Sequence, residues 1–422
     1  MFTLRSRAFV GLLFPLLGAA ACASTADETT DTGRADVTLG APSADEVGLS
    51  PKELLGKRLF EDTNLSEPRG QSCSSCHAAS AGFSGNNGSS IPAIARGARA
   101  GTFGNRNAPT AMYLAGAPRF SFVKEAPENG EPAPSYTPTG GQFWDGRADD
   151  LVAQAKGPFL NPREMNNPSS KAVVAKVASG KYAALARSVY GSAIIEDADR
   201  AYDAIAEAIA AFEETKRFQP FASKFDDVLR GTGTLSAQEA RGFDLFKDPE
   251  KGNCVSCHAG DTTSKSPSDW LFTDFTYDNI GVPRNRKIPD NDDPAYFDLG
   301  LCKRPGIEAT LPAGVAADDY CGAFKVPTLR NIAKTAPYMH NGYFAELRDV
   351  VKFYATRDTS PSQWYGTDAS GAVDKFDDLP PAYKKNVNTE EVPLERHFGD
   401  APRLTESEID DVVAFLQTLS DR

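Results

Sequence analysis

Apolar residues recur with helical spacing in two segments that lie far apart in the chain. Within residues 201–212, one helical face carries the apolar side chains of Ile205, Ala208, Ile209 and Phe212. Within residues 404–419, one face carries those of Ile409, Val412, Val413, Leu416 and Leu419. In the second segment Thr405 and Glu408 have the spacing of a capping box. The pattern predicts two amphipathic helices, each packed against an apolar core.

A second pattern occurs twice, once upstream of each of these helices. The first copy runs from Leu49-Ser50-Pro51 to Gly56-Lys-Arg-Leu-Phe60, and the second from Leu235-Ser236-Ala237 to Gly242-Phe-Asp-Leu-Phe246. Each copy predicts a capped amphipathic helix that ends in Leu-Phe. An internal repeat of this kind predicts two structurally related halves.

Each repeat continues into a Cys-x-x-Cys-His sequence. The copies are Cys73-Ser-Ser-Cys76-His77 and Cys254-Val-Ser-Cys257-His258. This sequence is the attachment signal of a c-type haem, because two thiols three positions apart reach both vinyl groups of one porphyrin. A redox cysteine pair or half of a zinc site would not need the same preceding helix twice. We therefore expect two covalent haems, with His77 and His258 as the proximal iron ligands.

The predicted fold is mainly α, with two cytochrome c-like domains that each bind one covalent c-type haem, long loops and little strand. We expect the N-terminal domain over residues 46–225 and the C-terminal domain over residues 226–422, since Gly231 and Gly233 interrupt the helical pattern near this boundary. A length of 422 residues suits two domains better than one core.

Two stretches rich in Pro, Gly and Asp, residues 124–142 and 283–319, are expected to be loops. Cys302 and Cys321 lie close together in the sequence and outside both haem motifs. In an oxidising compartment we expect these two residues to form a disulfide.

The N-terminus has the pattern of an export signal over residues 1–22. Two arginines precede an apolar run from Ala8 to Leu17, and small residues then lead to Cys22. Two interpretations remain open: lipoprotein processing with Cys22 as a lipid anchor, or ordinary cleavage between Ala21 and Ser24. Residues 23–45 are expected to be a disordered linker. Both interpretations predict a protein of the periplasm, or a lipoprotein anchored to the outer membrane.

The overall composition narrows the class of partner. Hydrophobic residues make up 41% and charged residues 24% of the chain, as in a globular protein. The net charge is −12, which argues against nucleic acid as a partner. A small neutral substrate, or a protein with a basic patch, fits this charge.

Together with the two haem motifs, four further blocks resemble the bacterial dihaem cytochrome c peroxidases, in particular the branch of MauG and MbnH. The resemblance extends from about residue 48 to the C-terminus. The blocks are Arg106-Asn107-Ala108-Pro109-Thr110, Phe143-Trp144-Asp145-Gly146-Arg147, Asn161-Pro162-Arg163-Glu164-Met165, and Phe324 to Asn331 continuing through His340 to Gly342.

The resemblance implies that hydrogen peroxide reacts at the N-terminal haem. Family members that need reductive activation carry a distal histidine before the Arg106 block, but this chain has none between Ser84 and Asn105. We therefore expect the N-terminal iron to be five-coordinate or water-bound. The family's distal acid–base residue corresponds to Glu164, since a carboxylate above iron can move a proton between the two peroxide oxygens.

For the second haem, the resemblance implies a tyrosine ligand. Peroxidases of the family carry a methionine fourteen residues after the histidine that corresponds to His340, and this chain has Tyr354 there. A phenolate is a hard anionic donor that stabilises high-valent iron. Met339 is a rival sulfur ligand that does not fit the family spacing. The resemblance also puts Trp144 between the haems as an electron relay.

The remaining expectations also come from the resemblance. A calcium ion would be held by the Asn107 side chain and by the main-chain carbonyls of Thr335 and Pro337, with water completing its shell. His340 is expected to have a structural or electron-transfer role, and the fourth histidine, His397, no special one. The pair Trp364-Tyr365 looks more like MbnH than MauG.

The leading hypothesis is a peroxide-dependent dihaem oxidoreductase. Oxidising equivalents would spread through Trp144 to give a paired Fe(IV) state, which would oxidise Trp or Tyr side chains of a periplasmic or secreted partner protein. One alternative is a cytochrome c peroxidase that reduces peroxide with electrons from a small redox protein. A non-enzymatic alternative is a dihaem electron carrier, which predicts two six-coordinate irons and no reaction with peroxide.

Overall fold

A computed structural model of the chain describes residues 43–124 and 136–422. The predicted export signal, Cys22 and the predicted linker up to residue 42 lie outside the described residues. The last linker positions, residues 43–45, are described, and the Asp45 carboxylate lies 3.0 Å from the Lys57 ammonium. No described helix is long and apolar enough to cross a membrane.

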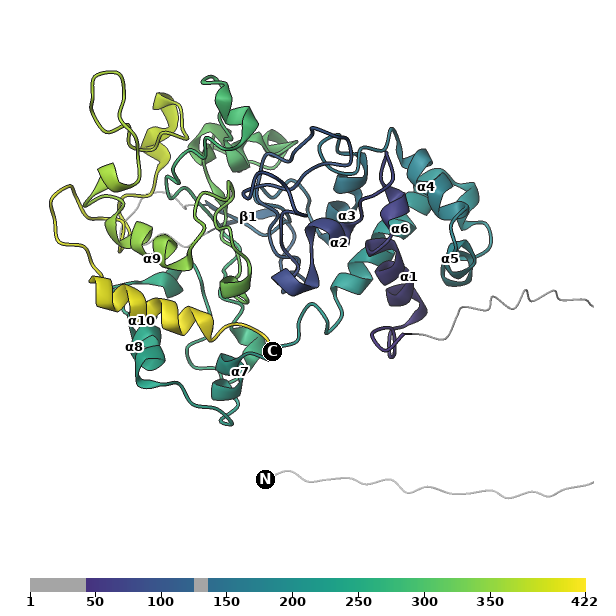
Figure 1. Cartoon of the computed structure of the whole chain (residues 1–422), viewed down its shortest axis with the longest axis horizontal. Coiled ribbons are helices and arrows are strands. Elements are labelled where there is room, and N and C mark those ends of the chain that lie inside the picture. Colours follow the sequence, from purple (N-terminus) through teal and green to yellow (C-terminus); the bar gives the residue numbers. More distant parts are fainter. Residues whose placement is uncertain (1–42, 125–135) are drawn as a thin grey trace, which may run out of the picture. The chain divides into compact units, whose positions relative to one another are not determined.

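Most of the regular structure is helical, as predicted (Figure 1). The helices before residue 220 are α1 (Pro51–Phe60), α2 (Cys73–Cys76), α3 (Leu151–Leu160), α4 (Ser170–Ala178), α5 (Ala183–Tyr190) and α6 (Ala198–Glu213). The later helices are α7 (Lys224–Leu229), α8 (Ala237–Lys247), α9 (Leu347–Thr356) and α10 (Glu406–Gln417). The four helices expected from the periodicity and the repeats are α1, α6, α8 and α10.

The helix starts follow the capping residues in the sequence. Ser50 and Glu53 form a capping box on α1, Ser236 forms one with Glu239 on α8, and the predicted box of Thr405 with Glu408 caps α10. In each box a side-chain oxygen accepts a hydrogen bond from a main-chain N–H that has no partner inside the helix. The caps therefore fix where α1, α8 and α10 begin.

The two helix pairs α1–α6 and α8–α10 cross in the same way, and each pair lies side by side in Figure 1. At Gly56 an added Cβ would lie 1.8 Å from the carbonyl oxygen of Ala208, and at Gly242 it would lie 1.9 Å from that of Asp411. Only glycine allows the two backbones to approach this closely. The repeated glycine in the sequence therefore marks a repeated helix crossing.

The described residues form two large hydrophobic cores, one from the part of the chain before residue 220 and one from the part after it. The first packs buried side chains from Leu55 to Phe218, and the second packs buried side chains from Phe225 to Leu419. Both belong to one compact unit that includes all described residues. The division of this unit into two domains at residues 225 and 226 stays a prediction.

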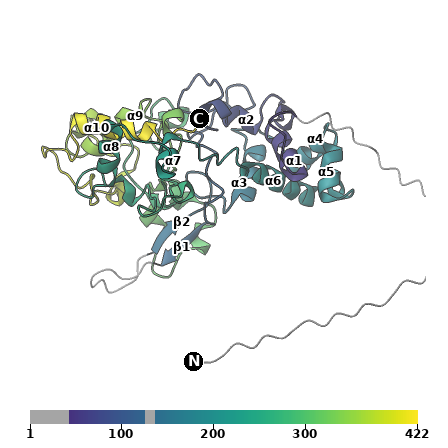
Figure 2. The same ribbon diagram turned by 90° about the horizontal axis from the view of Figure 1, so that it is seen from below.

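The stretch 124–142 is not entirely a loop, contrary to expectation. Strand β2 (Tyr136–Thr139) pairs antiparallel with β1 (Ser121–Lys124), as Figure 2 shows. The stretch 283–319 contains short 3₁₀ helices, η6 (Pro289–Asp292), η7 (Gly300–Lys303), η8 (Ile307–Ala309) and η9, which ends at Tyr320. The composition did not predict these elements, because main-chain hydrogen bonds define them and apolar periodicity does not.

A second two-stranded sheet pairs β3 (Tyr277–Asp278) with β4 (Phe324–Lys325). The predicted disulfide between Cys302 and Cys321 is confirmed. It closes the segment that carries η7, η8 and η9, beside a small cluster of buried apolar residues. Strands β3 and β4 contribute Asp278, Phe324 and Lys325 to the wall of the cavity described below.

Candidate functional site

The N-terminal motif begins on helix α2 and ends with His77 just after it. Cys73 and Cys76 are free thiols, not joined to one another. The Nδ1 atom of His77 lies 2.9 Å from the Phe83 carbonyl oxygen, so a proton on Nδ1 is donated there and Nε2 is left free. Burial lowers the pKa of His77, which keeps the imidazole in the neutral form that binds iron.

Glu164 lies in the turn after α3, close to this motif. The side-chain amide of Asn161 donates a 2.7 Å hydrogen bond to its Oε1. Burial raises the pKa of Glu164. Burial also raises the pKa of the Cys73 and Cys76 thiols, and the nearby Glu164 carboxylate raises it further. The structure therefore brings Glu164 and the first haem motif together, and a carboxyl with a raised pKa holds its proton more tightly than an exposed one.

The C-terminal motif has the same local design. Cys254 and Cys257 are free thiols that follow α8, with Cys254 on the short helix η4 (Cys254–Ser256). The Nδ1 atom of His258 lies 3.2 Å from the Phe272 carbonyl oxygen and 3.1 Å from that of Pro327. Burial lowers the pKa of His258 to about 4, so this imidazole is also neutral with Nε2 free.

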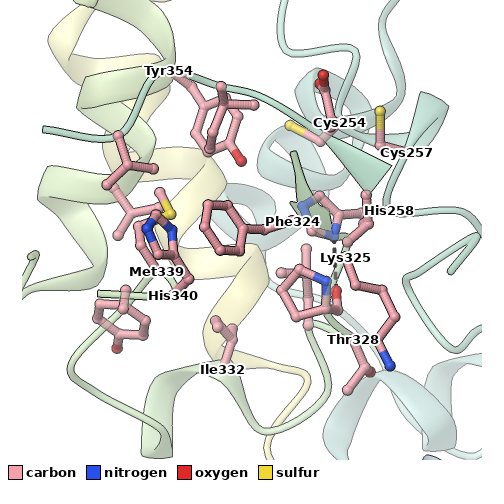
Figure 3. Close-up of a pocket in the computed structure, with 18 of the residues that line it drawn as sticks. Cys254, Cys257, His258, Phe324, Lys325, Thr328, Ile332, Met339, His340 and Tyr354 are labelled. Carbon is pink, nitrogen blue, oxygen red and sulfur yellow. Dashed lines mark hydrogen bonds between the residues drawn. The ribbon is translucent and has the colours of Figure 1, made fainter. Parts of the chain in front are cut away.

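Tyr354 on α9 lines the same cavity as the second motif. In Figure 3 its phenol and the imidazole of His258 point toward one another across the pocket. Burial raises the pKa of Tyr354, and the nearby Cys257 thiol and Asp278 carboxyl raise it further. The surrounding protein therefore disfavours a phenolate, and a positively charged group in the cavity would be needed to ionise this residue.

Met339 and His340 line this cavity as well. The His340 ring stacks on Phe324 at 3.6 Å between centroids, and burial lowers its pKa to about 3. Its Nε2 atom has no hydrogen-bond partner among the described residues. His397 is exposed at the surface, at 88% for its side chain.

The residues at both motifs fit c-type haems. Each motif offers two unpaired thiols and a neutral imidazole whose second nitrogen is held by a main-chain carbonyl. The second motif opens onto a cavity with mostly apolar walls, to which α9 contributes Val350 and Val351 and α10 contributes Val412 and Leu416. An apolar cavity with few polar groups suits a porphyrin ring.

Trp144 contacts both parts of the chain around this cavity. Its indole Nε1 donates a 2.9 Å hydrogen bond to the Asn107 carbonyl, and its own carbonyl accepts a 2.8 Å bond from the Lys325 N–H. The Asn107 N–H donates a 2.7 Å bond to the His340 carbonyl. These bonds hold the indole against the wall of the cavity that contains His258.

The three residues expected to bind calcium also lie together at this wall. The side-chain amide of Asn107 donates a 2.6 Å hydrogen bond to the Pro337 carbonyl, and Thr335 lines the same cavity. A cation between Asn107 and Pro337 would require the amide to turn so that its oxygen faces the carbonyl. The grouping agrees with the expectation, and calcium binding itself stays a prediction.

Two charged residues near Trp144 were missed in the sequence. Arg106 forms ion pairs with Asp145 and Asp298, which joins residues 192 positions apart. Lys325 is buried, donates a 2.6 Å hydrogen bond to the Gly141 carbonyl, and has its pKa lowered by burial to about 8. Both belong to the blocks that carry the family resemblance, which was the one available signal, but neither block reveals a contact partner.

Comparisons with known proteins identify the family of this chain. A family model described as di-haem cytochrome c peroxidase matches residues 50–234. The chain is 36% identical to methylamine utilization protein MauG of Paracoccus denitrificans over 375 residues, covering 87% of this chain and 88% of MauG. It is 33% identical to cytochrome c551 peroxidase of Nitrosomonas europaea, covering 71% of each chain.

Two solved structures are similar as well. The diheme peroxidase BthA from Burkholderia thailandensis superposes with a TM-score of 0.81 at 39% identity, covering 92% of this chain and 89% of BthA. A MauG-like protein associated with microbial copper homeostasis gives a TM-score of 0.59 at 26% identity, covering 90% and 92%.

The chain therefore belongs to the dihaem cytochrome c peroxidase family and is a peroxidase-type oxidoreductase. Within that family it is similar to the MauG-like branch, as the sequence predicted.

Proposed function

We propose that this protein uses hydrogen peroxide at its N-terminal haem to oxidise aromatic side chains of a partner protein from its C-terminal haem. The observation that carries the proposal is the position of Tyr354 opposite His258 in one cavity. A tyrosine ligand favours a high oxidation state of iron, whereas a methionine ligand favours the reduced state that accepts electrons from a donor.

The chain's own residues would hold both haems. Cys73 and Cys76 would bind one haem covalently, with His77 as a ligand of its iron. Cys254 and Cys257 would bind the second, with His258 and Tyr354 as ligands of its iron. When bound, such haems supply the capacity to cleave peroxide and store oxidising equivalents.

Glu164 would hold and move the proton that peroxide cleavage requires. Its carboxyl lies near Cys76, accepts a hydrogen bond from Asn161 and has a raised pKa. A group with these properties can take a proton from one peroxide oxygen and deliver it to the other. Asn161 orients the carboxylate so that only one of its oxygens is free for this task.

Trp144 would connect the two centres by giving and regaining one electron at a time. Its hydrogen bond to Asn107 fixes the ring, and its main chain is bonded to Lys325 of the C-terminal part. A fixed ring loses little energy to reorientation when its charge changes. Oxygen atoms of Asn107, Thr335 and Pro337 would bind a calcium ion near Trp144.

The proposal is tested by adding stoichiometric peroxide to the ferric protein without any reductant. Visible, near-infrared and Mössbauer spectra should then show that both irons change together. A ferric protein with two six-coordinate irons and no response to peroxide would contradict it and support the electron-carrier alternative.

A second candidate function is the reduction of peroxide with electrons from a small redox protein, favoured by the similarity to cytochrome c551 peroxidase. That function predicts sustained consumption of peroxide when a reduced small redox protein is supplied as the electron donor. Such a donor should support little consumption of peroxide if the partner-oxidation proposal is correct.

The proposed location is the periplasm, either as a free protein or as a lipoprotein anchored through Cys22. The basis is the export-signal pattern of residues 1–22. Mass spectrometry of the mature N-terminus would distinguish a lipidated cysteine from ordinary cleavage.

A further inference from the structure

Trp364 is an aromatic residue that the proposed function leaves without a role. It is one of three tryptophans in the chain. Trp270 is buried in the C-terminal core at 2% exposure, and Trp144 lines the cavity that contains His258. Trp364 is half-buried, on the short helix-to-loop segment after α9, and so has one edge in the core and one edge toward solvent.

A series of ring contacts leads from the cavity to Trp364. Tyr354, whose phenol faces the cavity, is followed at 6.2 Å by the ring of its fully buried neighbour Phe353. The Phe353 ring meets the Trp364 indole edge to face, at 5.6 Å between centroids and 88° between planes. Phe344 packs against the same indole at 5.7 Å and holds it from a second side.

The indole nitrogen of Trp364 is bonded in a way that suits electron loss. Its Nε1 donates a 3.0 Å hydrogen bond to the Thr356 hydroxyl, which in turn donates a 2.7 Å bond to the Lys352 carbonyl. Both acceptors belong to α9, the helix that carries Tyr354. An oxidised indole has a more acidic N–H, and an oxygen acceptor at that atom stabilises the positive charge.

The segment that carries Trp364 is poor in charge. Among residues 360–372 the single charged side chain is that of Asp368, although charged residues make up 24% of the whole chain. Ser360, Ser362, Gln363 and Gly366 of this segment are exposed. An aromatic side chain within small neutral residues has the composition of the centre of a protein–protein contact, where charges are depleted and aromatics are enriched.

We propose that Trp364 is the surface relay through which oxidising equivalents leave the C-terminal haem site for an aromatic side chain of the partner protein. This inference rests on the proposed function. Trp364 gives one electron to the C-terminal haem site, next to Tyr354. It then takes one electron from the partner, which is thereby oxidised. Two such transfers, with two protons, balance the reduction of one hydrogen peroxide to two waters.

The first test maps oxidation marks on the protein itself. The ferric dihaem protein is treated with a few equivalents of peroxide in the absence of any partner, digested, and analysed by mass spectrometry. Added oxygen should appear on Trp364 and not on buried Trp270. A parallel sample with excess cyanide, which occupies haem iron, should carry no mark, since the oxidation is then not delivered through the haems.

The second test uses Trp364→Phe, which keeps a ring against Phe353 and Phe344 but cannot be oxidised. The peroxide-induced spectral change should form at the same rate as in the parent protein and should persist about tenfold longer, as expected when the delivery of electrons to the C-terminal haem site becomes rate-limiting. Tyr383→Phe is a matched control, because Tyr383 is a half-buried aromatic residue on η12 (Pro381–Asn386) bonded to Asp318. It should leave the lifetime unchanged.

The outcomes distinguish failure of the Trp364 relay from failure of the proposed function on which it rests. A normal spectral change with no mark on Trp364, or with an unchanged lifetime in Trp364→Phe, would overturn the relay and leave the proposed function intact. No spectral change in the parent protein would overturn both.

Discussion

The indole of Trp144 is hydrogen-bonded to the main chain of Asn107, with 2.9 Å between Nε1 and the carbonyl oxygen. Asn107 is in turn bonded to two main-chain groups of the C-terminal part, the carbonyls of His340 and Pro337. The orientation of the indole is therefore set by a residue that itself joins the two parts of the chain. Any change in how these parts meet would reach Trp144 through Asn107.

Replacing Trp144 by Phe should separate the two haem centres. The hydrogen bond to Asn107 would be lost at a cost of about 1 kcal/mol in stability, because the carbonyl loses its donor. After peroxide addition, Mössbauer spectra of the iron-57 protein should show change at one iron instead of two. Trp364→Phe is the matched control and should still show change at both. Equal sharing in Trp144→Phe would contradict the relay role.

Replacing Glu164 by Gln should slow the reaction with peroxide by about 10²–10⁴-fold, the usual contribution of a positioned acid–base group. Glu164 must begin ionised to accept a proton, and burial raises its pKa above the ordinary value of 4.5. The rate in the parent protein should therefore fall as the pH is lowered through that raised pKa. Stopped-flow measurements across pH should show no such fall in Glu164→Gln.

The exposed residue Glu196 provides the control for this variant. Glu196→Gln should keep both the rate and the pH profile of the parent protein. If Glu164→Gln reacts as fast as the parent, the proton-transfer role is wrong.

Replacing Tyr354 by Phe should remove the sixth ligand of the second haem while keeping the packing against Phe353. The ferric absorption spectrum should shift toward that of a five-coordinate or water-bound haem, and the midpoint potential of that haem should rise, because an anionic donor has been lost. Spectroelectrochemical titration measures both. Tyr190→Phe is a suitable control, since the Tyr190 hydroxyl has no partner among the described residues. An unchanged spectrum in Tyr354→Phe would exclude the ligand assignment.

Replacing Glu213 by Gln should stabilise the protein at alkaline pH. Glu213 is buried at the end of α6, its Oε2 has no partner in the described part of the chain, and burial raises its pKa to about 8. The folded state thus holds this proton more tightly than the unfolded state. The free energy of unfolding should consequently fall by a few kcal/mol between about pH 4.5 and pH 8, since each pKa unit is worth about 1.4 kcal/mol.

Thermal unfolding followed across this pH range measures the effect. Glu213→Gln should match the parent protein near pH 4 and exceed it above pH 8. The exposed residue Glu196 gives the control, and Glu196→Gln should follow the parent protein at every pH. A parallel decline in all three proteins would assign the pH dependence to another group.

The parts of the fold that the sequence predicted are those encoded locally. The caps of Ser50, Ser236 and Thr405 depend on residues three positions apart, and so does each pair of haem cysteines. Such contacts are fixed by helix geometry and require no knowledge of the remaining chain. The disulfide between Cys302 and Cys321 could also be predicted, because these are the two described cysteines outside the haem motifs.

The parts that the sequence did not predict depend on partners that are distant in the chain. The strand pairing of Ser121 with Thr139 and the ion pair of Arg106 with Asp298 leave no periodic signature. The buried ammonium of Lys325 is acceptable only because the Gly141 carbonyl lies within hydrogen-bond distance. A single sequence taken alone specifies none of these distances.

The helix crossings at Gly56 and Gly242 support the haem motifs, but they do not include the residues that would make the two haems different. At both crossings the glycine lies directly against the main chain of the partner helix, so the same helix frame supports each motif. Glu164 and Tyr354, which we propose to distinguish the two centres, lie on other elements, the turn after α3 and the helix α9. The chemistry of one centre could therefore diverge from that of the other by single substitutions in its lining, without any change in the backbone that both halves share.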